Sequence, residues 1–378
     1  MIYNSISKFL KFSAVATAVM CASAQATIVK IETNMGDIEV NLFDETTPKT
    51  VKNFLWYVNN GDYDNAYFHR SVRDFIIQTG SFRFSQENDQ TEERTNPIAT
   101  NDPVENEPIY SNIEGTIAMA KIGGQENSAT AGWFFNLDDD NDDILDTQNG
   151  GFTVFGQVVS GLDIVQNMGD VDIYKAGGAF DELPLQNYDS NEAATRENLV
   201  IINKISIIDP SEDSAKNLSP VVNTEIYELN KELITNTKSE IEKFITEVEG
   251  YKTAAETAKT AASSISSEKA EIADTALTKI EETITELNTY LAPAEQYIAD
   301  LQAAENNNEN VLSLIPIRVE AMSTYSDAFD AKTVAKNQLE IAQNAAKQED
   351  SGGGSLSALL IAAFGLLIGR RRLSKQPR

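Results

Sequence analysis

The N-terminal half of the chain alternates apolar and polar residues in short runs, which is the pattern of β-strands. Residues 27–43 alternate on both sides of Gly36, and this predicts a β-hairpin. Further short strands are predicted at 115–120, 132–137 and 152–159. Many short strands with few helices favour a mainly β fold, here a closed antiparallel barrel capped by two helices.

The two helices are predicted at residues 48–60 and 161–168. In the first, Thr47 is the expected N-cap, Pro48 suits the first helical position, and Gly61 ends the helix. Four apolar residues fall on one face of this helix, as expected for a helix that covers a core. They are Val51, Phe54, Leu55 and Val58.

Composition changes after a polar, proline-flanked linker at residues 209–220, and residues 251–350 contain no glycine. Apolar residues then recur every three or four positions, which predicts long helices folded back on each other in a coiled-coil-like region. These residues are Ile241, Phe244, Val248, Tyr251, Ala255, Ala258, Ala262 and Ile265. Pro293 and Pro316 are expected to break helices, and residues 305–310 to form a loop. The region carries no chemical group along this seam, so we interpret it as a spacer or an oligomerisation stalk.

Both ends of the chain have the character of targeting segments. Residues 1–26 contain two lysines, an apolar run and Ala24-Gln25-Ala26, which predicts a cleaved secretory signal. Residues 351–378 contain glycines, an apolar run at 356–369 and three arginines at 370–372. That order resembles the GlyGly-CTERM sorting signal of Gram-negative bacteria, with a plain C-terminal membrane anchor as the alternative. We therefore expect an exported protein of the periplasm or cell envelope, or of the surface or medium after C-terminal processing, that meets the membrane through its tail.

Charge and composition exclude several functions. The net charge is −28, and removing both ends takes away bases but no acids. Such a surface repels phosphate, so nucleic acid is not an expected partner. With one cysteine and one histidine, Cys/His metal clusters and thiol redox pairs are not expected either. The acidic stretch 138–149 has alternating aspartates but lacks the glycine and closing glutamate of a calcium loop, so we interpret it as a solvated turn.

The chemically informative stretch is residues 67–80, "YFHRSVRDFIIQTG", in which Arg70 and Gln78 flank an apolar run. Together with residues 115–120, 128–137 and 152–165, it resembles the cyclophilin family of peptidyl-prolyl isomerases. The resemblance covers residues 27–209 and implies an eight-stranded barrel with the site at one end. It implies isomerisation of X–Pro bonds in proline-containing polypeptides, with no metal and no cofactor.

The resemblance assigns a role to each site residue. Arg70 would donate to the imide nitrogen of the twisted amide, and Gln78 would orient the substrate backbone and support the arginine. The proline pocket would be formed by Phe75, Ile76, Phe134 and Leu145, with Phe152 at its rim, and the backbone near Lys121 would pair with the substrate. His69 is expected to be structural.

Three positions depart from the family. Gly132 stands where cyclophilins usually have glutamine, Phe152 where many have His or Tyr, and Ile144 where eukaryotic members have Trp. These departures leave an alternative open, a non-catalytic module that binds proline segments, displayed at the surface on a helical oligomerisation stalk. The predicted domains are a signal peptide (1–26), the isomerase domain (27–209), a helical region (210–350) and a sorting or anchor segment (351–378).

Overall fold

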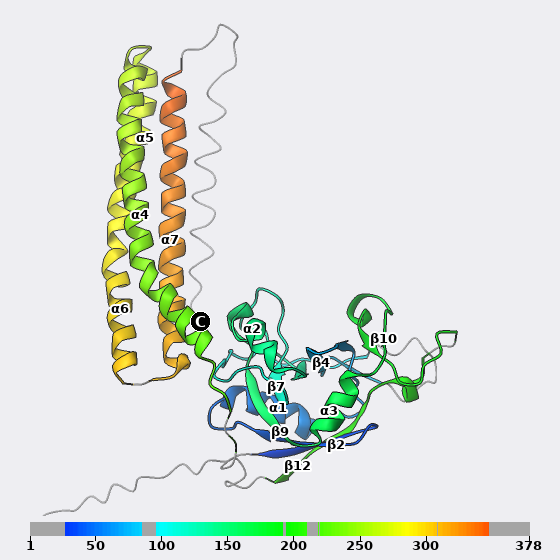
Figure 1. Ribbon diagram of the computed structural model, residues 1–378. Coiled ribbons are helices and arrows are strands. Elements are labelled where there is room, and N and C mark those ends of the chain that lie inside the picture. The colour runs from blue at the N-terminus through cyan, green and yellow to red at the C-terminus, as the bar shows by residue number, and fades with distance from the viewer. Residues whose placement is uncertain are drawn as a thin grey trace, which may run out of the picture. The chain divides into compact units, whose positions relative to one another are not determined.

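The computed structural model describes residues 27–84, 96–191, 194–209, 218, 220–307 and 309–347. The predicted signal peptide and C-terminal segment lie outside these residues. The chain forms two compact units. The first contains the described residues up to Glu232 together with Ala303–Pro316, and the second contains Leu233–Gln302 and the residues from Ile317 onward. Figure 1 shows the strands in the first unit and the long parallel and antiparallel helices that make up the second.

The first unit is built on one antiparallel sheet with the strand order β12-β1-β2-β9-β7-β8-β4-β3. In chain order its strands are β1 (Ile28–Thr33), β2 (Asp37–Leu42), β3 (Arg70–Val72), β4 (Ile76–Thr79), β7 (Thr116–Met119), β8 (Trp133–Asn136), β9 (Val154–Ser160) and β12 (Ile202–Asp209). The predicted hairpin is confirmed, because β1 and β2 pair across the turn at Gly36.

The prediction of a closed barrel is wrong, because the sheet is a curled half-barrel with β3 and β12 as its two edges. Within the described residues, the segments that precede these two edge strands are joined by an isolated bridge, from Tyr67 to Ile201. The backbone N–H of Ser71 in β3 instead donates to the carbonyl of Glu182 at 2.7 Å. The segment that carries Glu182 thus binds this edge of the sheet through one backbone N–H group.

The shorter elements of this unit connect the strands and cover them. They are β5 (Phe82–Arg83), β6 (Asn96–Pro97), β10 (Ile173–Tyr174) and β11 (Leu183–Pro184), the helices α1 (Pro48–Asn60), α2 (Asp142–Leu145) and α3 (Leu162–Gly169), and the 3₁₀ turns η2 (Asp139–Asn141), η3 (Gln148–Gly150), η4 (Gly178–Phe180) and η5 (Arg196–Asn198). The helices α1 and α3 confirm the two predicted helices. Gly61 adopts φ 69° directly after α1, which a glycine accommodates without strain.

The central strands are buried on both faces, and each face belongs to a different cluster. On the concave side, Ile77, Ile117 and Phe135 join the main core with α1. On the other side, Ile76, Ala118 and Phe134 join a smaller cluster. Because successive side chains of a strand point to opposite faces, neighbours in sequence are divided between the two.

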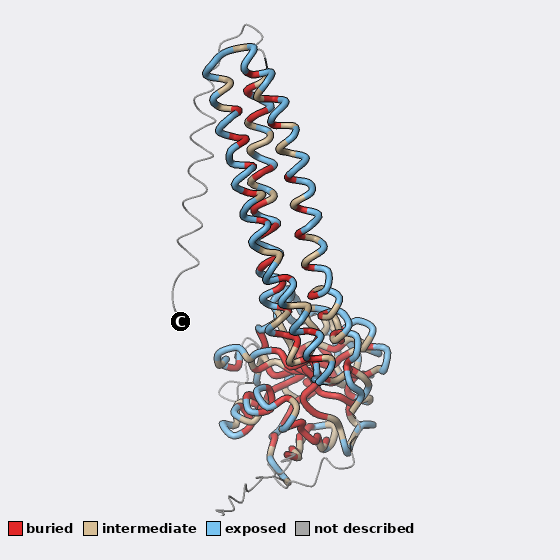
Figure 2. The backbone as a smooth tube through the Cα atoms, turned by 90° about the vertical axis from the view of Figure 1, so that its left-hand side faces the viewer, coloured by how far each residue is buried: buried red, intermediate tan, exposed pale blue. Residues whose placement is uncertain are grey.

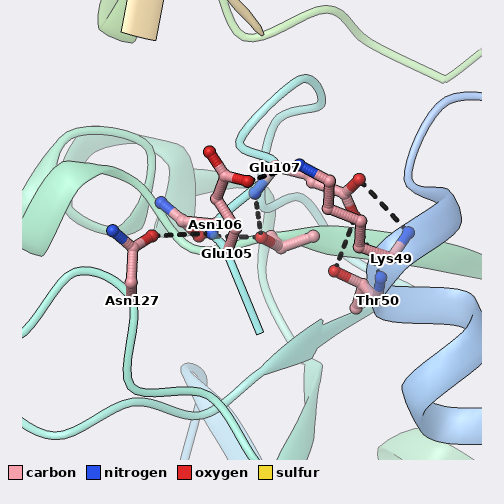
Figure 3. Close-up of polar contacts among 7 residues, drawn as sticks. Lys49, Thr50, Glu105, Asn106, Glu107 and Asn127 are labelled. Atoms are coloured by element: carbon pink, nitrogen blue, oxygen red, sulfur yellow. Dashed lines mark hydrogen bonds and ion pairs between the residues drawn. The ribbon is translucent and has the colours of Figure 1, made fainter. Parts of the chain in front are cut away.

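The first turn of α1 is capped from a distant loop rather than by its own N-cap residue. Thr47 makes no capping hydrogen bond, and its hydroxyl donates to the carbonyl of Phe43. The Glu107 carboxylate accepts from the backbone N–H of Thr50 at 2.9 Å, from its hydroxyl at 2.8 Å, and from the N–H of Lys49 at 3.3 Å. Figure 3 shows this carboxylate facing the end of the helix. The helix dipole and the unpaired N–H groups favour an anion there.

The helical region consists of α4 (Thr224–Ser263), α5 (Ser267–Thr289), α6 (Leu291–Asn306) and α7 (Val311–Ala345). Its core is rich in alanine, and it contains Ile241, Phe244 and Val248 from the predicted seam. Figure 2 shows buried positions recurring between exposed ones along these helices. Alanine at the buried positions lets the helices approach closely. The described residues of these helices do not show a continuous coiled coil.

The two prolines of this region differ in effect. Pro293 lies in the first turn of α6, just after α5 ends, as expected. Pro316 lies inside α7, so the prediction that it breaks a helix is wrong. It is the sixth residue of that helix, and the helix continues through it without the hydrogen bond that an N–H at this position would donate to the carbonyl of Leu312. Among the described helices, none is long and apolar enough to cross a membrane.

Candidate active site

The predicted site residues meet in one row that crosses five strands. Arg70 pairs with Gln78, Gln78 with Phe134, Phe134 with Ala118, and Ala118 with Val154. Directly paired residues project from the same face of a sheet. The row lies on the face opposite the main core, since its apolar members belong to the smaller cluster. The prediction of a site at one end of a barrel is therefore replaced by a site on the outer face of the sheet.

The five predicted pocket residues form one apolar cluster beside Arg70 and Gln78. They are Phe75, Ile76, Phe134, Leu145 and Phe152. Ile76, Phe134 and Leu145 are buried, whereas Phe75 and Phe152 are half-buried and border the cluster. The rings of Phe134 and Phe152 meet edge to face, with their centroids 5.8 Å apart. The cluster thus has a fixed apolar floor and two partly accessible aromatic side chains at its border.

The side chain of Lys121 contacts both the backbone of a nearby loop and the ring of Phe152. Its Nζ donates to the carbonyls of Asn149 at 2.9 Å and Gly151 at 2.5 Å, and lies 4.7 Å from the centroid of the Phe152 ring. The ammonium group therefore ties the end of β7 to the loop before β9 and holds the Phe152 ring by a cation–π contact. This contact was not expected from the sequence, because it depends on the path of that loop.

A chain of buried amides connects the two border aromatics. Asn141 donates to the Phe75 carbonyl at 2.7 Å and to Asn136 at 2.8 Å. Asn136 donates to Asn112 at 3.2 Å, and Asn112 donates to the Phe152 carbonyl at 3.2 Å. Because buried amides are strongly favoured to keep their hydrogen bonds, this chain sets the spacing of Phe75 and Phe152.

The acidic stretch 138–149 builds the turn that carries Leu145. Asp138 accepts from the backbone N–H of Asp140, and Asp146 is buried and accepts from Asn112 at 2.7 and 3.0 Å. Burial raises the pKa of the Asp146 carboxyl above its usual value, while the hydrogen bonds from Asn112 oppose this. Among the described residues, no three His, Cys, Asp or Glu side chains come together in a way that would hold a metal ion.

The loop leading to Phe152 is fastened to helix α1 through the capping carboxylate. Asn106 donates to the carbonyl of Gly151 at 2.8 Å and accepts from the Thr153 hydroxyl at 2.7 Å, while the N–H of Glu107 donates to that hydroxyl at 2.8 Å. Gly151 has φ 74°, and a Cβ there would lie 2.6 Å from the carbonyl oxygen of Asp146, so glycine is required. Figure 3 shows Asn106 beside Glu107, whose side chain faces Thr50 of α1.

Arg70 is held by an ion pair that the sequence did not indicate. Its Nε lies 2.7 Å from Oε2 of Glu182, and the two side chains are 37% and 42% exposed. Glu182 directly precedes β11, far from Arg70 along the chain. The guanidinium is accessible from solvent and lies beside the apolar cluster, so it is available to a bound ligand.

His69 is buried behind this arginine and has a structural environment. Burial, with a smaller contribution from the positive charge of Arg70, lowers its pKa to about 4. Its ring meets Phe82 edge to face at 5.1 Å. The imidazole is therefore neutral near pH 7 and buried, which agrees with a structural role, although its Nδ1 has no hydrogen-bond partner among the described residues.

The positions that depart from the family surround the cluster. Gly132 precedes Phe134 by two residues, so it lies on the same face of the sheet. A Cβ at Gly132 would lie 3.3 Å from Oγ of Ser81 and 3.4 Å from Cβ of Ala120. Ile144 is 51% exposed at the edge of α2.

Comparison with known proteins identifies the family of the sheet domain. The family model described as cyclophilin type peptidyl-prolyl cis-trans isomerase/CLD matches residues 28–189. A peptidyl-prolyl cis-trans isomerase of Acinetobacter baylyi is 35% identical over 43% of this chain and 84% of the relative, and peptidyl-prolyl cis-trans isomerase B of Escherichia coli is 38% identical over 40% and 88%. A crystal structure of a Cryptosporidium parvum cyclophilin with the dipeptide Ala-Pro matches 48% of this chain and 99% of its own, at 22% identity and a TM-score of 0.36.

The family model and these relatives place the sheet domain in the class of the prolyl isomerases. The chain belongs to the cyclophilin-type peptidyl-prolyl cis-trans isomerases. The matched residues end before β12, which nevertheless completes the same sheet by pairing with β1.

Proposed function

We propose that this isomerase acts on X–Pro bonds of exported proteins, and that Arg70 is its catalytic residue. The reaction rotates an amide bond across a barrier of about 18–20 kcal/mol, and no covalent bond is made or broken. In the twisted state the imide nitrogen regains its lone pair and accepts a hydrogen bond. A guanidinium that is always charged and planar suits that task, and it stabilises the twisted state more than the planar one.

The remaining residues hold the substrate. The proline ring would rest on Phe134, Ile76 and Leu145, between the aromatic borders, which exclude water from the rotating bond. Gln78, paired with Arg70 across the strands, would bind the substrate backbone next to the proline. The backbone at Lys121 would pair with the extended substrate chain, and Phe152 would close one side of the pocket. No proton transfer, metal or cofactor is required by this mechanism.

The observation that carries the proposal is the row Arg70–Gln78–Phe134, which places a cation, an amide and an apolar surface side by side. The test is acceleration of cis/trans exchange in a proline peptide, followed by NMR exchange spectroscopy. We expect Arg70→Ala to remove most of the acceleration while the fold is retained. Arg73→Ala is the matched control, because Arg73 is an exposed arginine whose ion pair with Asp170 lies outside the row. Equal activity of the wild type and Arg70→Ala would refute the mechanism, and binding without acceleration would favour a non-catalytic module.

The export proposal rests on the two ends of the chain. A basic, apolar and small-residue order at 1–26, and a glycine-rich, apolar and arginine-rich order at 351–378, favour secretion followed by sorting at the cell envelope. The test is the intact mass of the mature protein isolated from cells. A mass that includes residues 1–26 would refute secretion through a cleaved signal.

For the helical region we propose self-association. Its α7 presents Val319, Met322, Tyr325 and Phe329 along one face, with exposures of 52%, 48%, 37% and 46%. Three of them line a hollow of about 470 Å³ together with residues of α4. Exposed apolar strips of this kind mark interaction surfaces. Sedimentation equilibrium of the mature chain tests this: we expect Met322→Ser and Phe329→Ser to reduce association, whereas Val159→Ser, on an exposed strand position, should not.

A further inference from the structure

Glu182 lies where it can control the orientation of the proposed catalytic arginine. Its Oε2 is 2.7 Å from Nε of Arg70, and both side chains remain partly exposed. We propose that Glu182 is a positioning residue, which holds the Arg70 guanidinium so that its outer edge faces the twisting amide. This inference rests on the proposed role of Arg70 and adds to it a residue from a different part of the chain.

The ion pair involves Nε of Arg70, and this choice of nitrogen is what allows Glu182 to orient the guanidinium. Nε is the inner nitrogen of the guanidinium, bonded to Cδ, and the two Nη groups lie further out along the side chain. Because the group is planar, holding Nε fixes the plane and the direction of the outer N–H groups. An unrestrained arginine side chain has a large rotamer entropy that must be lost when it engages the substrate. A side chain that is already oriented loses less of it.

The carboxylate is itself presented by a fixed backbone. The carbonyl of Glu182 accepts from the N–H of Ser71 at 2.7 Å, so backbone and side chain of this residue both hold β3. The next residue, Leu183, is 3% exposed in a cluster with Tyr67. On the preceding turn, the ring of Phe180 lies 5.0 Å from that of Phe82. The hairpin formed by β10 and β11 therefore holds Glu182 from both sides.

Folding stability does not explain the pair. Ion pairs between exposed side chains contribute little to stability, because water screens both charges. A carboxylate beside the guanidinium also reduces the positive charge presented to the substrate. If that attenuation were its main effect, removing the carboxylate would raise activity; if positioning is its main effect, removal lowers activity. The direction of the change therefore separates the two.

The experiment measures kcat and KM for a proline peptide by NMR exchange in the full mature chain. For Glu182→Ala we expect kcat to fall about three- to ten-fold with KM nearly unchanged, since the orientation matters only in the twisted state. Glu182→Gln should retain most of the activity, because its amide oxygen can still accept from Nε–H. Asp170→Ala is the matched control: it removes another exposed ion pair of 2.7 Å, to Arg73, and should leave kcat unchanged.

The outcomes separate this inference from the function on which it rests. If Arg70→Ala is inactive while Glu182→Ala is as active as the wild type, or more active, the positioning role is refuted and the role of Arg70 stands. If Arg70→Ala is fully active, the proposed mechanism fails first. The Nε–H resonance of Arg70 gives a readout independent of activity: it should be sharp and protected from exchange in the wild type, and broadened in Glu182→Ala. An unchanged resonance in that variant would also overturn the inference.

Discussion

Arg70 and Gln78 are directly opposed across the antiparallel pair of β3 and β4, so both side chains leave the sheet on the same face. The backbone of this pair is held independently of the Gln78 side chain, because the N–H of His69 donates to the Gln78 carbonyl at 3.1 Å. The cation and the amide therefore lie where one ligand can reach both, and the side chain of Gln78 can be changed without disturbing the ladder.

We predict that Gln78→Ala lowers kcat/KM for a proline peptide by about three- to ten-fold, which corresponds to the loss of about one hydrogen bond to the substrate. The thermal midpoint should change little. Gln186→Ala is a suitable control, because Gln186 is another partly buried glutamine of the same domain but donates to the carbonyl of Leu199, away from the row. An unaltered kcat/KM in Gln78→Ala would remove Gln78 from the site.

Gly132 is the second test of the site. Its φ is not in the left-handed region, and the nearest atoms to an added Cβ lie at 3.3 and 3.4 Å, so a side chain requires only small shifts of its neighbours. We predict that Gly132→Gln, which restores the residue usual in the family, lowers KM by about three-fold through an added contact with the substrate backbone. Gly132→Ala adds the Cβ alone and should not lower KM. A rise in KM for both variants would mean that crowding at Ser81 and Ala120 outweighs the contact.

His69 gives the sheet domain a defined dependence on pH. Its pKa is about 4 in the folded chain and 6.5 in the unfolded chain, mainly because burial disfavours the charged imidazolium. The contribution of the neutral imidazole to the free energy of unfolding is fully present above pH 6.5. Between pH 6.5 and 4 the unfolded state binds more protons, so stability falls as pH falls. Between pH 7 and pH 5, this one group is expected to lower the free energy of unfolding by about 2 kcal/mol.

The measurement is urea unfolding followed by tryptophan fluorescence, which reports on the sheet domain because Trp56 and Trp133 are the two tryptophans of the chain. His69→Gln cannot take up the proton, so its loss of stability between pH 7 and pH 5 should be smaller than that of the wild type by about 2 kcal/mol. Carboxylates titrate equally in both proteins. Parallel curves for the two proteins would show that the imidazole is not buried as described.

Glu107 is predicted to be a major contributor to the stability of the sheet domain. It is 2% exposed, and it accepts from two backbone N–H groups of the first turn of α1. We expect Glu107→Ala to lower the free energy of unfolding by about 2–3 kcal/mol, since a helix cap and a buried hydrogen-bond acceptor are lost together. The urea midpoint measured by tryptophan fluorescence gives this value.

The neighbouring glutamate provides the control for that experiment. Glu105 pairs with Lys49 at the surface, and Glu105→Ala should change stability by less than about 1 kcal/mol. Because the Glu107 network also holds the loop that carries Phe152, Glu107→Ala should raise KM in addition. A stable Glu107→Ala variant with unchanged KM would show that neither the cap nor the loop depends on this carboxylate.

Much of the site could be predicted from the sequence, because its core is carried by a local motif. Arg70 and Gln78 lie on strands joined by a tight turn, so their spacing along the chain nearly determines that they are paired. Phe75 and Ile76 lie in and directly after that turn, whereas Phe134 lies on β8 and comes beside them through the pairing of β4 with β8. Lys121 and Phe152 lie beside each other in the fold, and the contact of the ammonium with the ring depends on a loop closed by Asn149 and Gly151.

Glu182, Glu107 and the amide chain from Asn141 to Asn112 could not be predicted in this way. Each acts through a side chain that meets a partner tens of residues away, and no periodicity or spacing marks it. The acidic stretch 138–149 illustrates the difference. In the sequence it is a run of solvated charges, whereas in the fold Asn141 and Asp146 are buried and support the two sides of the apolar cluster.

The sequence by itself determined the first hairpin, the strands near 116–119, 133–136 and 154–160, and the helices near 48–60 and 162–169, because alternation of period two and the helical repeat are properties of local backbone geometry. Only the tertiary structure decided that the sheet stays open, since the edge N–H of Ser71 is taken by the carbonyl of Glu182 from an inserted hairpin. It also decided what holds the arginine and the pocket borders. Those contacts depend on how loops far apart in the chain satisfy their buried polar groups, and that can be settled only when the whole domain has folded.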